Sequence, residues 1–138
     1  MEVSLALLAD CANISREGKL NIMGIFDRIN AQSIPVVHPQ MQLIMTLEAD
    51  RAEADREHKI EVELIDSDGA KLFAIGGHIQ FGPPPPGERV KVNHIIQLNN
   101  VQFNRFGVHE FKILLNNEVR RSVPLHIVEA RKESPAQQ

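Results

Sequence analysis

The chain has few of the residues on which many small-protein functions depend. In 138 residues there is no Trp or Tyr and only one Cys, and the net charge at pH 7 is −3. A single cysteine cannot form an intrachain disulfide, which fits a reducing compartment. The lack of a basic excess argues against nucleic acid as a partner. No stretch approaches the ~20 apolar residues that span a bilayer. The N-terminus also has no basic region before its apolar run, as a signal peptide would. We therefore expect a cytoplasmic protein with no membrane partner.

Three tight turns between strand-like segments predict an antiparallel all-β fold. Asn-Asn suits the left-handed positions of a two-residue hairpin turn, and Gly suits the bulge position of longer hairpin loops. Residues 3–14 meet residues 19–29 across residues 16–18, residues 58–65 meet residues 71–81 across residues 66–69, and residues 107–115 meet residues 118–128 across Asn116-Asn117. The apolar run of residues 5–9 could also be helical by its length, but Gly18 and the β-rich segment after it favour the hairpin.

Alternating apolar and polar residues predict further strands with one buried face. Residues 41–47, 58–64 and 109–115 show this period clearly. The proline-containing segments 34–39 and 82–87 are expected to cross between sheets, because proline cannot donate to a central ladder. Residues 48–57 are charged and predict a solvated loop or one short helical turn. The polar tail of residues 131–138 is expected to be disordered.

The second part of the chain resembles an immunoglobulin-like or fibronectin-III-like sandwich. The strand of residues 95–101, followed by residues 107–111 and a hairpin, is similar to the ending of such domains, with His109 where a corner tyrosine usually lies. We expect an antiparallel sandwich of about eight strands over residues 41–128, with an added N-terminal hairpin over residues 3–29. Both would belong to a single domain of residues 1–130, a domain count that the length also predicts.

The whole chain resembles a bacterial family of small uncharacterised β-sandwich proteins. The shared residues are Leu7-Leu8-Ala9-Asp10, Ala12, Gly18-Lys19-Leu20-Asn21, Gly24-Ile25-Phe26 and Asp66-x-Asp68-Gly69. This resemblance implies no activity.

The sequence offers little catalytic or metal-binding chemistry. Asp66 and Asp68 could contribute to a calcium site, but the helices and the closing Glu of an EF-hand are missing, so a hairpin turn is favoured. The six histidines have no ligand-like spacing, and His109 is expected to be buried. Cys11 has no partner that would activate its thiol, and it is expected to be a small core residue. We expect no catalytic residue, no cofactor and no enzyme activity.

Two apolar segments could mediate contacts with a partner. The N-terminal hairpin is apolar on both strand faces, so Leu8, Ile25, Phe26 and Ile29 could complete the core or form an interface. The stiff prolines Pro84 and Pro85 could be recognised by an aromatic groove, or could form only a rigid loop. The favoured interpretation is a non-catalytic protein-interaction or self-assembly module, with another protein or a second copy in a homodimer as partner. The alternative is a β-sandwich that binds a small ligand or calcium through loop carboxylates.

Overall fold

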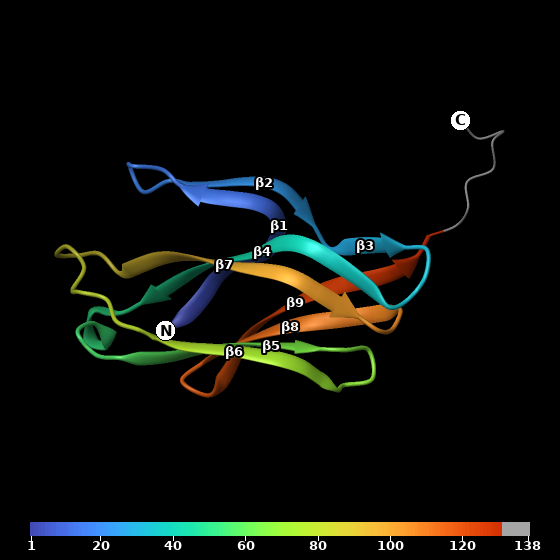
Figure 1. The fold of residues 1–138 in the computed structure, drawn as a ribbon. Coiled ribbons are helices and arrows are strands. Elements are labelled where there is room, and N and C mark those ends of the chain that lie inside the picture. The colour runs from blue at the N-terminus through green and yellow to red at the C-terminus, as the bar shows by residue number, and fades with distance from the viewer. Residues whose placement is uncertain (131–138) are drawn as a thin grey trace.

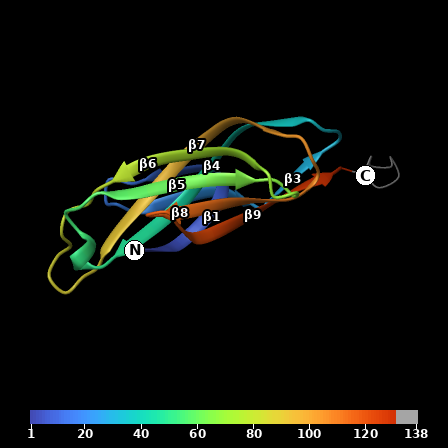
Figure 2. The same ribbon diagram turned by 90° about the horizontal axis from the view of Figure 1, so that it is seen from below.

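The computed structural model describes residues 1–130, which fold into two β-sheets packed face to face (Figures 1 and 2). The prediction of an all-β protein is confirmed. The strands in these residues are β1 (Glu2–Ile14), β2 (Leu20–Phe26), β3 (Arg28–Ala31), β4 (Val36–Ala49), β5 (His58–Ile65), β6 (Lys71–Ile79), β7 (Val90–Phe103), β8 (Gly107–Leu115) and β9 (Glu118–Glu129). The predicted tail, residues 131–138, lies outside the described residues.

The chain passes several times from one sheet to the other. One sheet has the strand order β2-β1-β4-β7, and the other has the order β3-β9-β8-β5-β6. The short β3 pairs in parallel with β9, whereas the other pairs are antiparallel. The segments after β2, β3, β4, β6 and β7 each carry the chain from one sheet to the other. Residues 34–35 and 82–87 thus lie in crossovers as the prolines predict, although β4 already begins at Val36.

The three predicted hairpins are confirmed. They join β1 to β2, β5 to β6 and β8 to β9. Asn116 and Asn117 have φ angles of 50° and 70°, as a two-residue type I′ turn requires. The charged segment between β4 and β5 contains one short 3-10 helix, η1 (Arg51–Glu53), as its composition suggested.

The core lies between the two sheets and is mainly aliphatic. Strand alternation supplies it: every second residue of β5, β8 and the second half of β9 is buried. Phe103 and Phe111 are the largest of the fully buried side chains. His109 is also fully buried, as expected, with its ring edge-on to Phe103 and its Nδ1 3.2 Å from the carbonyl oxygen of Gly107.

The N-terminal hairpin is built into the sandwich more closely than the sequence indicated. Residues 2–9 of β1 pair with β4, so the first half of β1 is an interior strand of its sheet. Residues 28 and 29, which we expected to end the hairpin, instead begin β3 on the edge of the other sheet. The second half of the hairpin leaves the layer of β4 and β7 and rises away from it in Figure 1.

The described residues contain no helix of the length and apolarity needed to cross a membrane.

Candidate functional site

The outer half of the β1–β2 hairpin is a two-stranded ribbon that has left its sheet. Pairing of β1 with β4 ends at Ala9 and Gln42, whereas pairing of β1 with β2 continues to Ile14 and Leu20. One side-chain contact bridges the point of departure: the backbone N–H of Ala12 donates to Oε1 of Gln42 at 2.6 Å. A two-stranded ribbon is marginally stable in water unless something packs against it.

The two faces of this ribbon differ in exposure. Ala12, Leu20 and Ile22 lie on one face and are half-buried, whereas Ile14 at the end of that face is 45% exposed. The other face carries Cys11 and Met23, which are register partners, and Ile25 two residues further along β2. We call these three residues the outer hairpin face. Met23 is 73% exposed and Ile25 is 64% exposed, which is unusual for large aliphatic side chains.

A close approach between Asp10 and Gly24 shapes the middle of the ribbon. Gly24 has a φ angle of 74°, and a Cβ atom at this position would lie 2.4 Å from Oδ2 of Asp10. Only glycine leaves room for the Asp10 side chain and also accepts this backbone conformation without strain. Asp10 and Gly24 belong to the two N-terminal motifs on which the family resemblance rests, so those motifs are geometrically coupled.

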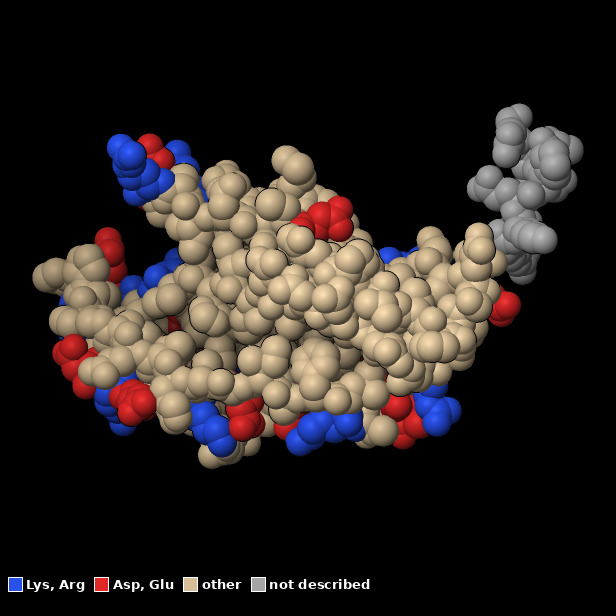
Figure 3. All heavy atoms as spheres, in the orientation of Figure 1, with Lys and Arg blue, Asp and Glu red and all other residues tan. Residues whose placement is uncertain are grey.

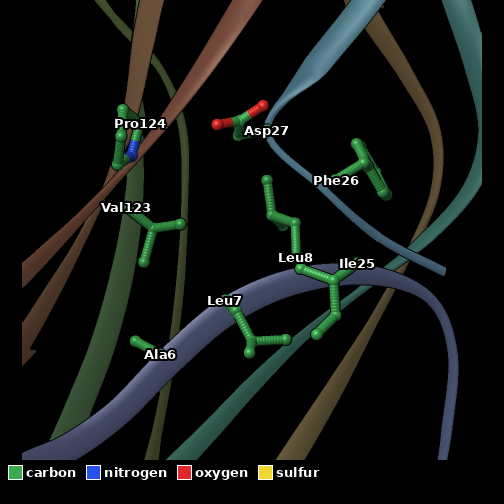
Figure 4. Close-up of a pocket in the computed structure, with 8 residues that line it drawn as sticks. All are labelled: Ala6, Leu7, Leu8, Ile25, Phe26, Asp27, Val123 and Pro124. Atoms are coloured by element: carbon green, nitrogen blue, oxygen red, sulfur yellow. The ribbon is translucent and has the colours of Figure 1, made fainter. Parts of the chain in front are cut away.

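A pocket of about 360 Å³ opens beside the base of the hairpin (Figure 4). In Figure 4, residues of β1 lie opposite Val123 and Pro124 of β9, and Ile25 connects the pocket to the outer hairpin face. At Pro124 the edge of β9 is unpaired, because β3 covers only the later part of that strand. The lining residues are Ala6, Leu7, Leu8, Ile25, Phe26, Asp27, Val123 and Pro124. A mainly apolar pocket that continues into an exposed apolar face is a candidate docking surface.

The structure separates the hairpin residues that we considered as interface candidates. Leu8 and Ile29 are buried in the chain's own core, whereas Ile25 is exposed and Phe26 is partly buried against that core. Ile25 and Phe26 therefore stay candidates, while Leu8 contributes to the pocket only from its wall. Sequence reasoning did not identify Met23, which the strand register alone brings beside Cys11.

Hydrogen bonds tie the proline loop of residues 82–87 to the body of the protein, although most of the loop is exposed. Pro84 is buried, and its carbonyl oxygen accepts a hydrogen bond from the Arg51 guanidinium at 2.7 Å. Pro85 is exposed, and its carbonyl oxygen accepts the N–H of Glu88 at 3.0 Å, which closes a turn. These contacts favour the rigid-loop interpretation.

Cys11 does not lie in the core, so that expectation was wrong. The thiol is exposed on the outer hairpin face, because β1 has already left β4 at this residue and nothing in the described chain covers it.

Asp66 and Asp68 lie in a turn that their own contacts close. The N–H groups of Asp68 and Ala70 both donate to Oδ1 of Asp66 at 2.9 Å. These bonds, the one from Ala70 above all, lower the pKa of the Asp66 carboxyl, and the nearby Arg105 lowers it further. Arg105 also forms an ion pair with Asp68 at 2.7 Å. In residues 1–130 no three His, Cys, Asp or Glu side chains gather in a metal-binding arrangement.

Comparisons with known proteins identify a family but no activity. The sequence model of a family of unknown function, DUF6941, matches residues 4–128. No curated protein matches the sequence. Among solved structures, the chain is similar to the Pseudomonas fluorescens alkylpurine DNA glycosylase AlkC bound to DNA containing an abasic site analog, with a TM-score of 0.45 and 16% identity. The match covers 73% of this chain and 27% of that chain.

The comparison corrects our expectation about partners. From the net charge we predicted a protein partner or a second copy, with nucleic acid and membrane excluded. Net charge alone was too weak a basis for excluding nucleic acid, and we withdraw that exclusion; the similar structure is of a protein bound to DNA. A likeness at this level assigns no partner to the chain, and its partner is unknown.

Proposed function

Because the chain belongs to the family of unknown function DUF6941, we propose a function from its own geometry: a non-catalytic protein-interaction module that binds a second polypeptide on the outer hairpin face. The observation that carries this proposal is the exposure of Met23 and Ile25 at the place where the β1–β2 ribbon leaves its sheet. The adjoining pocket could receive a side chain of the bound protein.

Physical considerations support a protein at this surface. Large apolar side chains that cluster on an exposed surface mark interaction sites more often than isolated ones do. The outer hairpin face has no charged side chain among its three residues, and cores of protein interfaces are likewise poor in charge. Methionine adapts its shape to a partner surface, and Met23 is the most exposed large apolar residue of the described chain.

We also propose that the sandwich is immunoglobulin-like. β4 and β7 are neighbours in one sheet, as strands B and E are in that fold. β5, β8 and β9 lie together in the other sheet, as strands C, F and G do. The exposed unpaired thiol of Cys11 is compatible with a reducing compartment such as the cytoplasm.

Photo-crosslinking from Cys11 tests the proposed function, because this single natural thiol lies within the outer hairpin face. The chain labelled with a benzophenone maleimide and irradiated in an extract of its native cells should give a discrete adduct with one protein. Ile25→Glu should lower the adduct yield at least tenfold, since burying an unpaired carboxylate in an interface costs several kcal/mol.

The matched control is Val119→Glu, which places the same charge at an apolar side chain of similar exposure on the β8–β9 hairpin. It should leave the yield unchanged. A label moved to Glu118→Cys in a Cys11→Ser background should not give the same adduct. Equal yields from Ile25→Glu and the unsubstituted chain would show that the outer hairpin face does not bind the captured protein.

A further inference from the structure

The side of the sandwich opposite β2 and β3 is left open. The sheets end there at β7 and β6, and neither strand has a second neighbour among the described strands. Each therefore presents a row of backbone N–H and C=O groups that a further strand could pair with. Figure 2 shows β6 and β7 along the same side of the molecule.

The core is incompletely covered along this side. The pairing of Val62 with Ile75 and of Leu64 with Phe73 places Ile75 and Phe73 on the core face of β6. Val62 is fully buried, yet its partner Ile75 is 39% exposed. On β7, Ile96 pairs with the fully buried Leu43 but is itself only half-buried. Inward-facing residues thus reach solvent from both sheets.

Three adjoining pockets form one groove between β6 and β7. The first and second share Ile75, and the second and third share Phe73, Asn99 and Val101. Their volumes are about 140, 240 and 300 Å³. The groove therefore runs along the two free edges and is not a compact cavity. Its elongated shape suits an extended ligand. We call it the β6–β7 groove.

The lining of the β6–β7 groove is apolar and amide-rich. Its lining includes the apolar residues Ile60, Val62 and Leu98 and several Asn and Gln residues of β7. No Lys, Arg, Asp or Glu lines it. Figure 3 shows the same face with a broad uncharged band across its middle and charges mainly along its lower margin and at the hairpin tip. Burial lowers the pKa of His94, which disfavours a positive charge on that side chain. A nucleic-acid strand would find no cation here for its phosphates.

We propose that the β6–β7 groove binds an extended, uncharged segment of another polypeptide, which inserts as a strand between the free edges of β6 and β7. The unpaired edges supply backbone hydrogen bonds, and the exposed core residues receive alternate apolar side chains of the inserted strand. This site is separate from the outer hairpin face and does not depend on the function proposed for that face.

Two adjacent glycines give a matched pair of variants. Gly77 pairs with the buried Ile60 and faces the groove, and a Cβ atom at Gly77 would meet nothing within 4 Å. Gly76 pairs with Glu61 on the opposite face, where a Cβ atom would make an ordinary contact at 3.4 Å. Neither glycine has a positive φ angle. Gly77→Val should therefore fill the groove without disturbing the fold. Gly76 also borders the groove, but its pairing with Glu61 directs a side chain to the opposite face, so Gly76→Val should change the same strand while leaving the groove open.

The probe is a synthetic peptide of alternating Thr and Val, eight residues long and capped at both ends, with binding measured by calorimetry. We expect saturable binding that Gly77→Val weakens at least tenfold and Gly76→Val leaves within twofold. Met23→Glu should not affect it, which separates this proposal from the first. Amide hydrogen exchange should show peptide-dependent protection in β6 and β7. If Gly77→Val does not fold by circular dichroism, Ile75→Ser serves instead, because it removes an apolar contact from the groove wall.

Several results would overturn the proposal. They are no saturable binding of the peptide, equal affinity for the Gly77→Val and Gly76→Val variants, or protection confined to β2. Preferential binding of a single-stranded oligothymidylate over the peptide, with protection in β6 and β7, would also overturn it and would assign the groove to nucleic acid.

Discussion

Phe111→Ala should lower the free energy of unfolding by about 3–5 kcal/mol, the range measured for aromatic-to-alanine changes in cores. Phe111 is fully buried on β8, and it pairs with Leu64 on one side and Val123 on the other. The substitution removes a ring at the centre of the larger sheet, so both lost burial and the remaining cavity contribute. Since domains of this size are stable by only about 5–15 kcal/mol, the loss should be visible as a large fall in the thermal midpoint.

Urea unfolding followed by far-UV circular dichroism measures this effect, and Val108→Ala on the same strand is its control. Val108 is exposed, so its truncation should change the free energy of unfolding by less than about 0.5 kcal/mol. If Phe111→Ala cost no more than Val108→Ala, the face of β8 that carries Phe111 would not point into the core.

Gly24→Val should destabilise the β1–β2 hairpin by at least about 1–3 kcal/mol, the usual cost of forcing a non-glycine residue into a strained backbone conformation. At Gly24 two effects combine. The φ angle of 74° is unfavourable for a β-branched residue, and the new Cβ would lie within 2.4 Å of Oδ2 of Asp10. The same urea titration measures the loss of stability, and hydrogen exchange in residues 9–26 shows whether the loss is confined to the hairpin.

Gly18→Val separates these two effects. Gly18 has a φ angle of 84°, but a Cβ atom there would meet nothing within 4 Å, so only backbone strain remains. Replacing Asp10 with Ala should recover part of the loss in Gly24→Val and none in Gly18→Val. If a double-mutant cycle showed that the effects of the Asp10 and Gly24 changes on the free energy of unfolding simply add, that result would contradict the contact between them.

Period-2 patterns and turn residues predicted the strands well because both are local. The Asn116-Asn117 turn and the alternation of Ile60, Val62 and Leu64 require no knowledge of the rest of the chain. The role of residues 28–31 was not predictable in this way. In the sequence, residues 28 and 29 look like the end of the preceding strand, and only the position of β9 in space makes residues 28–31 a strand of the other sheet.

The candidate surfaces were predictable only in part, because the exposure of a side chain depends on where the pairing between neighbouring strands ends. The sequence indicated that the hairpin is apolar on both faces, and so it pointed to Ile25 and Phe26. It could not show that β1 leaves β4 after Ala9, which exposes Cys11 and Met23. The β6–β7 groove was missed for a similar reason, because nothing in the local sequence identified β6 and β7 as the two free edges.

The most direct test of a polypeptide on the outer hairpin face is the alkylation rate of the Cys11 thiol, followed by mass spectrometry. The reaction should be fast in the isolated chain, because this thiol is exposed. It should slow severalfold in an extract of the native cells compared with the same extract passed through a filter that removes macromolecules. In Ile25→Glu the two rates should be equal. Equal rates in both extracts for the unsubstituted chain would mean that no macromolecule covers this face, and would contradict the function proposed for it.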